Sequence, residues 1–73
     1  MAEQIHAEIV AKVIEVARGE GADLVAGEAV LVLESMKMEI PVLTGIAGRL
    51  SRVAVRVGDV VQEGDLLAVV EGA

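Results

Sequence analysis

The chain has 73 residues, a formal net charge of −6 at pH 7, and neither cysteine nor aromatic residues. The absence of cysteine excludes disulfides, thiolate zinc sites and cysteine nucleophiles. The acidic balance without aromatic stacking platforms argues against a nucleic-acid partner. A chain of this length forms at most one small domain, so we expect residues 1–73 to share one core built from Val, Leu, Ile, Ala and Met.

The chain opens with Met1-Ala2-Glu3-Gln4, which has neither the basic region nor the apolar stretch of a signal peptide. No run approaches the roughly 18 apolar residues that suggest a membrane span. We therefore expect a cytoplasmic protein with no membrane partner.

The residues from Ile5 to Ala17 are ambiguous when they are considered alone. Their apolar side chains recur at helical spacing, but they also alternate as in a strand. An internal repeat resolves the ambiguity, because a shift of 37 residues places Ile9–Glu34 on Ile46–Glu71 without a gap. The identical pairs are Ile9/Ile46, Val16/Val53, Ala17/Ala54, Gly21/Gly58, Gly27/Gly64, Val32/Val69 and Glu34/Glu71.

The second copy is the easier one to assign. Gly45 and Gly48 disfavour a helix, because each costs about 1 kcal/mol relative to Ala in a helix interior. The predicted elements are a strand over Leu50–Val55, turns at Gly58-Asp59 and Gly64-Asp65, and a buried strand over Leu66–Val70.

Carried back to the first copy, this pattern predicts two strands over Ile5–Ala17, turns at Gly21 and Gly27, and a buried strand over Ala29–Leu33. Each copy then has one apolar face that it cannot bury alone. Packing the copies about a pseudo-twofold axis predicts an all-β fold, a flattened β-barrel or sandwich of two antiparallel sheets. The connection around residues 35–45 remains exposed in such a fold.

Residues 34–39 are predicted to form a hairpin between apolar strands over Val30–Leu33 and Ile40–Leu43. A two-residue turn at Met36-Lys37 fits this spacing, although both residues would need positive φ, which is costly for residues other than glycine. Strain at an exposed tip indicates function rather than stability.

Lys37 is the candidate functional residue, because a lysine side chain is long, exposed and acylatable at its tip. Exposed Met36 and Met38 would provide an adaptable recognition surface. Glu34 and Glu39, if they lie close, would favour the charged ammonium, so an enzyme must deprotonate Lys37 before it reacts. A simpler interpretation buries both methionines and leaves Lys37 merely solvated. The position of Met-Lys-Met at the junction of the repeat disfavours it.

The hexapeptide Glu34-Ser35-Met36-Lys37-Met38-Glu39 resembles the attachment motif of biotinyl domains, and Gly58–Leu67 resembles the second-half motif of the same family. The resemblance covers nearly the whole chain. It points to the biotinyl/lipoyl attachment domain family of the biotin carboxyl carrier type, and most closely to short, free-standing biotinylated proteins of mycobacteria. The implied fold is the hammerhead-like biotinyl domain, and the chain has no room for a thumb insertion.

The resemblance implies that a biotin protein ligase joins biotin to the Lys37 ε-amine as an amide. Met36 and Met38 would assist ligase recognition, and Glu34, Ser35 and Glu39 would complete the hairpin. Biotin would accept carboxylate at a biotin carboxylase and deliver it at a carboxyltransferase. The chain itself would be a non-catalytic carrier component, and we expect it to be a monomer in isolation.

Two departures from the family pattern lie away from the hairpin. The first-half turn reads Gly21-Ala22-Asp23 where Gly-Asp or Gly-Gln is common, and Ala7–Ala11 replaces a frequent Pro-x-x-Gly. Three alternatives remain open. A lipoyl domain of a 2-oxo acid dehydrogenase complex shares the fold, but its tip usually reads Asp-Lys-Ala. A cofactor-free interaction module and a biotin storage or signalling protein are the other two.

Other residues offer no second site. His6 is the only histidine and forms neither a metal site nor a catalytic triad by itself. The carboxylates of Glu28, Glu34, Glu63 and Glu71 are expected to be solvated charges at turns and strand ends.

Overall fold

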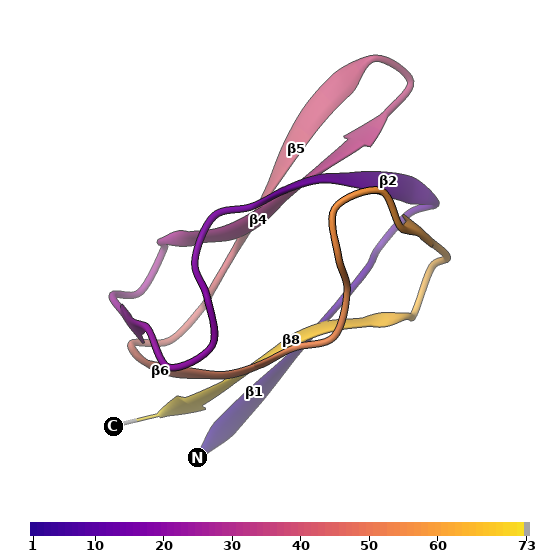
Figure 1. The fold of residues 1–73 in the computed structure, drawn as a ribbon. Helices are drawn as coiled ribbons and strands as arrows, with labels where there is room; N and C mark the ends of the chain where they lie inside the picture. Colours follow the sequence, from indigo (N-terminus) through magenta and orange to yellow (C-terminus); the bar gives the residue numbers. More distant parts are fainter. Residues whose placement is uncertain (73) are drawn as a thin grey trace.

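The computed structural model describes residues 1–72, and Ala73, the last residue of the expected unit, lies outside the described residues. The elements it contains are all strands, as predicted (Figure 1). They are β1 (Ala2–His6), β2 (Ala11–Val16), β3 (Asp23–Leu24), β4 (Ala29–Ser35), β5 (Met38–Leu43), β6 (Gly48–Val53), β7 (Val60–Val61) and β8 (Leu66–Gly72).

The strands form two four-stranded antiparallel sheets with the orders β1-β8-β6-β3 and β5-β4-β2-β7. Replacing each strand by its partner in the repeat converts the first order into the second. Strands β2, β3 and β4 start and end 37 residues before β6, β7 and β8. The predicted pseudo-twofold sandwich is therefore confirmed, and the two sheets face each other across the core (Figure 1).

The turns that close the two halves are also equivalent. Gly21 and Gly58 have φ angles of 92° and 100°, a region that L-residues with a side chain rarely adopt. The Gly21 N–H donates to the Leu50 carbonyl at 2.7 Å, and the Gly58 N–H donates to the Val13 carbonyl at 2.8 Å. Each turn is thus hydrogen-bonded to the opposite copy.

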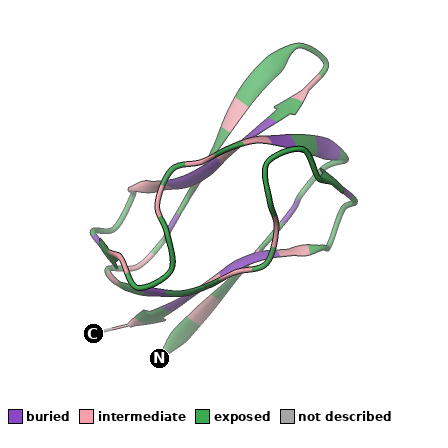
Figure 2. Ribbon diagram, in the orientation of Figure 1, coloured by how far each residue is buried: buried purple, intermediate pink, exposed green. Residues whose placement is uncertain are grey.

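The core lies between the sheets and comes from both copies (Figure 2). Strands β4 and β8 have the same burial pattern along their lengths. Burying one Leu or Val side chain contributes about 1.5–3 kcal/mol, and in this chain aliphatic side chains alone provide that burial. The largest fully buried hydrophobic side chains are Leu31, Leu50, Leu67, Val13, Val30 and Val70.

The strand predicted over Leu50–Val55 begins and ends two residues earlier, at Gly48 and Val53. Gly48 lies against β8, where a Cβ atom would overlap the Glu71 carbonyl oxygen. Only glycine permits this backbone approach, so Gly48 extends the strand although it weakens strands in general. The separation of Ile5–Ala17 into two strands is confirmed as β1 and β2.

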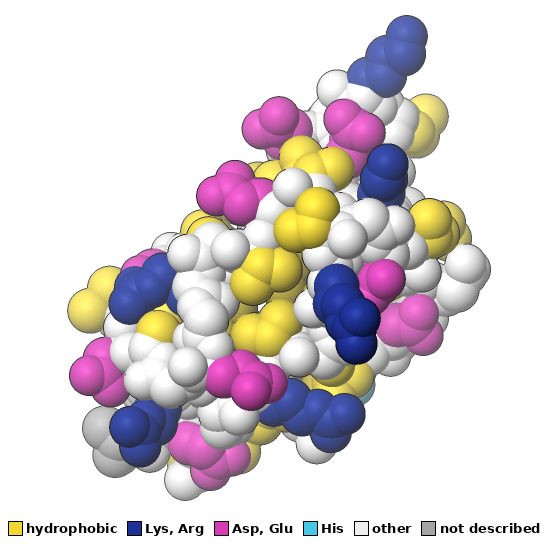
Figure 3. All heavy atoms as spheres, viewed as in Figure 1, with side chains coloured by type: hydrophobic (Ala, Val, Ile, Leu, Met, Phe, Trp, Pro, Cys, Tyr) yellow, Lys and Arg dark blue, Asp and Glu magenta, His cyan; other side chains and the backbone are white. Residues whose placement is uncertain are grey.

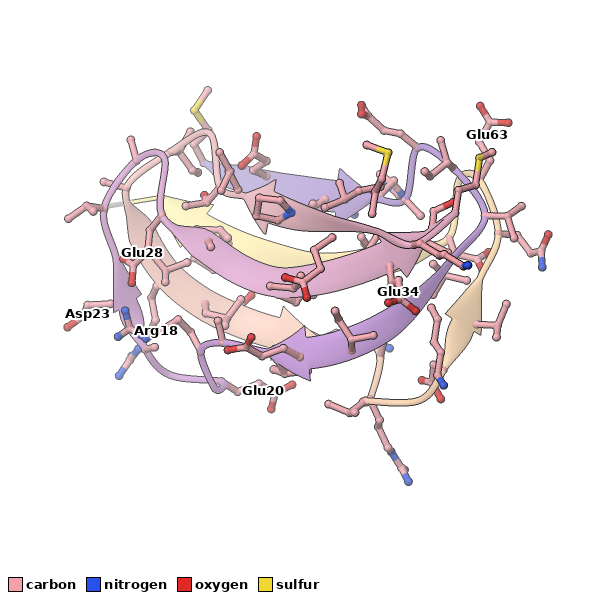
Figure 4. All side chains as sticks on the ribbon, turned by 90° about the horizontal axis from the view of Figure 1, so that it is seen from above. Arg18, Glu20, Asp23, Glu28, Glu34 and Glu63 are labelled. Atoms are coloured by element: carbon pink, nitrogen blue, oxygen red, sulfur yellow. The ribbon has the colours of Figure 1, made fainter. Side chains whose placement is uncertain are left out.

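The expectation that Glu28 is merely solvated is wrong. Its carboxylate forms an ion pair with Arg18 and accepts a hydrogen bond from the Val25 N–H at 3.0 Å. The Val25 bond, followed by the Arg18 guanidinium, holds the pKa of Glu28 below its ordinary value. Figure 4 shows Arg18 and Glu28 facing each other with Asp23 beside them. The ion pair therefore links the turn before β3, which contains Arg18, to the turn after β3, which contains Glu28.

A second set of polar interactions, all hydrogen bonds, holds the loop between β5 and β6 in place. Thr44 is buried, and its hydroxyl donates to the Ile46 carbonyl at 2.8 Å. The Glu3 carboxylate on β1 accepts a hydrogen bond from the Gly45 N–H at 2.9 Å.

Among residues 1–72, no helix is long and apolar enough to cross a membrane.

Candidate functional site

The hairpin between β4 and β5 has the predicted two-residue turn. Glu34 pairs with Glu39 and Ser35 with Met38, which leaves Met36 and Lys37 as the turn. Their φ angles are 54° and 66°, so both residues have the left-handed conformation of a type I′ turn. The prediction of positive φ at both positions is therefore confirmed.

The turn conformation is imposed by the strands that flank it. Leu31 and Leu33 on β4 are buried in the core, and they fix the register of the hairpin. The left-handed conformation costs about 1–3 kcal/mol for each residue that carries a side chain. The hairpin therefore carries this conformational cost at its tip, because Met36-Lys37 stands where a type I′ turn favours Asn-Gly.

The side chains of the turn lie in solvent. Met36 is 91% exposed and Met38 is 65% exposed, so the interpretation that buries both methionines is wrong. Lys37 is exposed as well, and within residues 1–72 the one ion pair is that of Arg18 with Glu28. A basic side chain stands clear of the surface at the projecting end of the molecule (Figure 3).

Carboxylates lie two positions below the turn. Glu34 is directly opposite Glu39 on β5, and its other neighbour across the sheet is Lys12 on β2. Like charges directly opposite each other destabilise a strand pair, so this arrangement does not serve the hairpin's own stability. Both glutamates are exposed, in line with the expectation for Glu34.

The inner face of the hairpin continues into an apolar groove that the sequence does not reveal. Side chains alternate along a strand, so Met38 and Ile40 share one face of β5, and Ser35 and Leu33 share the matching face of β4. Below Met38 lies a groove of about 390 Å³, whose walls include Leu33, Ile40 and Ile9. Ile9 lies in the loop between β1 and β2. No sequence pattern around Ile9 predicts its contact with the hairpin strands.

The hairpin occupies one end of an elongated molecule of 35 × 19 × 17 Å. It projects beyond the sandwich, whereas the first and last described residues lie at the other end (Figure 1). Glu34 and Glu63 lie toward the hairpin end, and the Arg18–Glu28 pair lies toward the opposite end (Figure 4). A group on Lys37 would thus extend away from the body of the protein.

This arrangement presents a lysine side chain to solvent. Within residues 1–72 there is no cluster of three or more His, Asp or Glu side chains that could hold a metal ion. The His6 side chain is exposed on β1, with Nδ1 3.1 Å from the Gly64 carbonyl oxygen. An amide-linked group fits Lys37 without rearrangement, because the amine is exposed and has no protein partner among the described residues.

Comparisons with known proteins agree with this geometry. The Biotin_lipoyl family model, described as biotin-requiring enzyme, matches residues 3–70. The biotinylated protein TB7.3 homolog of Mycobacterium leprae is 59% identical over 70 residues, which cover 96% of this chain and 99% of that protein.

Solved structures show the same fold. A single-chain, multi-domain long-chain acyl-CoA carboxylase matches 99% of this chain and 7% of its own, with a TM-score of 0.90 and 40% identity. The lipoyl domain of the 2-oxoglutarate dehydrogenase complex from Azotobacter vinelandii matches 94% of this chain and 99% of its own, with a TM-score of 0.77. At 22% identity, the second likeness concerns the fold alone.

Proposed function

The chain belongs to the biotin/lipoyl attachment family, and on that premise we propose that it is a biotin carboxyl carrier with biotin joined to Lys37. The observation that carries the proposal is the exposed lysine in a strained two-residue turn, flanked by Met36 and Met38 at the projecting end of the molecule. The mycobacterial relative, a biotinylated protein that matches over nearly its full length, supports biotin as the attached group.

Each residue of the hairpin has a role in this proposal. Lys37 supplies the amine that becomes the amide nitrogen, and Met36 and Met38 form the apolar surface that a biotin protein ligase recognises. Ser35 holds the hairpin pairing at Met38, and Glu34 and Glu39 mark its rim with negative charge. The strands below keep the turn rigid, so the ligase meets a preorganised lysine.

The chain contributes position and reach, and the chemistry belongs to the attached group and to partner enzymes. Biotin, once attached, supplies the atom that accepts carboxylate at a biotin carboxylase and releases it at a carboxyltransferase. The likeness to a domain of a long-chain acyl-CoA carboxylase supports partners of this class. We further propose that residues 1–73 act as one carrier domain, as a cytoplasmic monomer between encounters.

The lipoyl alternative is tested by giving the chain both ligases. Incubation with a biotin protein ligase or a lipoate ligase, followed by intact-mass measurement, should show a biotinyl increment and no lipoyl increment. The double variant Met36→Asp/Met38→Ala introduces the lipoyl-type tip and should slow biotin attachment. The matched control Met36→Leu/Met38→Leu keeps the apolar surface and should not. Lipoyl attachment to the wild-type chain would overturn the assignment of biotin.

The carboxyl carrier role needs a separate experiment, because storage or signalling proteins would also carry biotin. The biotinylated chain is supplied to a biotin carboxylase with ATP and labelled bicarbonate, and label on the protein is counted. The biotinylated chain should accept label far more efficiently than the same concentration of free biotin, because docking raises the effective concentration at the active site. Equal efficiencies would contradict the carrier role.

A further inference from the structure

The sulfur-containing side chains of the chain lie at its two ends. The sequence has three methionines and no cysteine. Met36 and Met38 flank Lys37 and are 91% and 65% exposed, while Met1 is 99% exposed and lies at the far end from the hairpin. The methionine side chains at the proposed attachment site are therefore accessible to small oxidants.

We propose that Met36 and Met38 form a reversible oxidation site, at which conversion to the sulfoxide by a peroxide blocks modification of Lys37. The proposal rests on biotin attachment at Lys37. In each step a sulfur lone pair attacks one oxygen of hydrogen peroxide and the O–O bond breaks. The thioether is oxidised to the sulfoxide, and the peroxide is reduced to water. A thiol-dependent methionine sulfoxide reductase reverses the change, and its own thiols end as a disulfide.

The consequence follows from what the oxygen does to the contact surface. A methionine side chain is apolar and adapts its shape to a partner's groove, whereas a sulfoxide is polar and chiral. A partner that buries both side chains would have to desolvate the new oxygens without supplying hydrogen-bond donors. We expect attachment to slow by at least roughly tenfold, because an unpaired buried polar group costs binding of that order.

The effect is confined to recognition, because oxidation does not disturb the fold. Neither Met36 nor Met38 belongs to the buried core. The hairpin register depends instead on buried residues such as Leu31 and Leu33. Oxidised protein should therefore keep the circular dichroism spectrum and the unfolding midpoint of the untreated chain. Met1 provides an internal comparator, since it is also exposed, at 99%, but lies far from Lys37.

The experiment uses the full-length chain and hydrogen peroxide. Wild type and Met36→Leu/Met38→Leu are treated, peptide masses locate the sulfoxides, and initial rates of biotin attachment are measured with a biotin protein ligase. Wild type should gain sulfoxides at Met36, Met38 and Met1 and lose at least about tenfold in rate, which sulfoxide reductases restore. The double variant should be oxidised at Met1 alone, and its rate after treatment should equal the rate of the same variant without treatment.

Different outcomes separate this proposal from the function on which it rests. Equal rates for treated and untreated wild type would overturn the oxidation site and leave the attachment site intact. An equal loss in the double variant would also overturn it, because the damage would then lie at Met1 or in the ligase assay. Failure of untreated wild type to accept biotin would overturn the proposed function and this inference with it.

Discussion

At the scale of single residues, Met36 and Lys37 adopt backbone conformations that their side chains disfavour. Both have positive φ in a turn whose preferred residues are Asn and Gly. The sequence was sufficient to predict this strain, because the register of two apolar strands leaves room for two turn residues. The exposure of Met36 and Met38 was also expected, but the sequence does not give its extent, which depends on how far the hairpin projects from the sandwich.

The strain at Met36 predicts that a turn-forming residue stabilises the protein. Met36→Asn should raise the free energy of unfolding by about 1 kcal/mol, because Asn tolerates the left-handed conformation. Urea denaturation measures the change. Met38→Asn is the matched control, since Met38 is a strand residue, and it should give no gain. A Met36→Asn variant no more stable than wild type would show that the turn is not strained.

Glu28 predicts how stability depends on pH. Its pKa is lowered in the folded protein by the Val25 N–H and by Arg18, so folding favours the carboxylate. The resulting stabilisation is complete above the ordinary pKa of 4.5 and is lost as pH falls through the lower folded value. Glu28→Gln should flatten this part of the curve of unfolding free energy against pH.

Glu63→Gln is the matched control for the acid profile, because it removes an exposed carboxylate for which the structure records no hydrogen bond. Its curve should keep the wild-type slope below pH 4.5. A slope that is unchanged in Glu28→Gln would mean that Glu28 is not the group whose protonation weakens the fold.

At the scale of elements, the internal repeat carried most of the fold prediction. Strands, turns and burial recur with a period of 37 residues, so the clear second copy settled the ambiguous first one. Features without a counterpart in the repeat were missed. Arg18 corresponds to Val55, so its ion pair with Glu28 occurs in one copy only. The groove below Met38 was also missed, because one of its walls is Ile9, and only tertiary packing brings Ile9 next to the hairpin strands.

The contact between β6 and β8 gives a prediction at this scale. Gly48→Ala should destabilise the protein by about 2 kcal/mol or more, because the new methyl group would overlap the Glu71 carbonyl and force the strands apart. Thermal or urea unfolding measures the loss. Gly19→Ala is the matched control, since a Cβ there meets no atom within 4 Å, and its stability should stay close to that of wild type. Equal stabilities for both variants would contradict the close approach.

At the scale of the whole molecule, the pseudo-twofold axis explains the shape but not the function. The axis relates the β4–β5 hairpin to the β8 and β1 strands at the opposite end, and those ends are not joined by a turn. One of the two symmetric ends therefore presents a closed loop with a lysine. The family resemblance supplied the proposed chemistry, since strand patterns alone could not distinguish biotin from lipoate.

The lysines of the chain allow the central claim to be tested directly, because there are two of them and they occupy contrasting positions. Lys37 is in the turn, whereas Lys12 is an exposed residue within β2. Wild type, Lys12→Arg and Lys37→Arg are each incubated with a biotin protein ligase, and their intact masses are measured. We predict one biotinyl group on wild type and on Lys12→Arg, and none on Lys37→Arg. Biotin retained by Lys37→Arg, or lost from Lys12→Arg, would contradict the assignment of Lys37 as the attachment site.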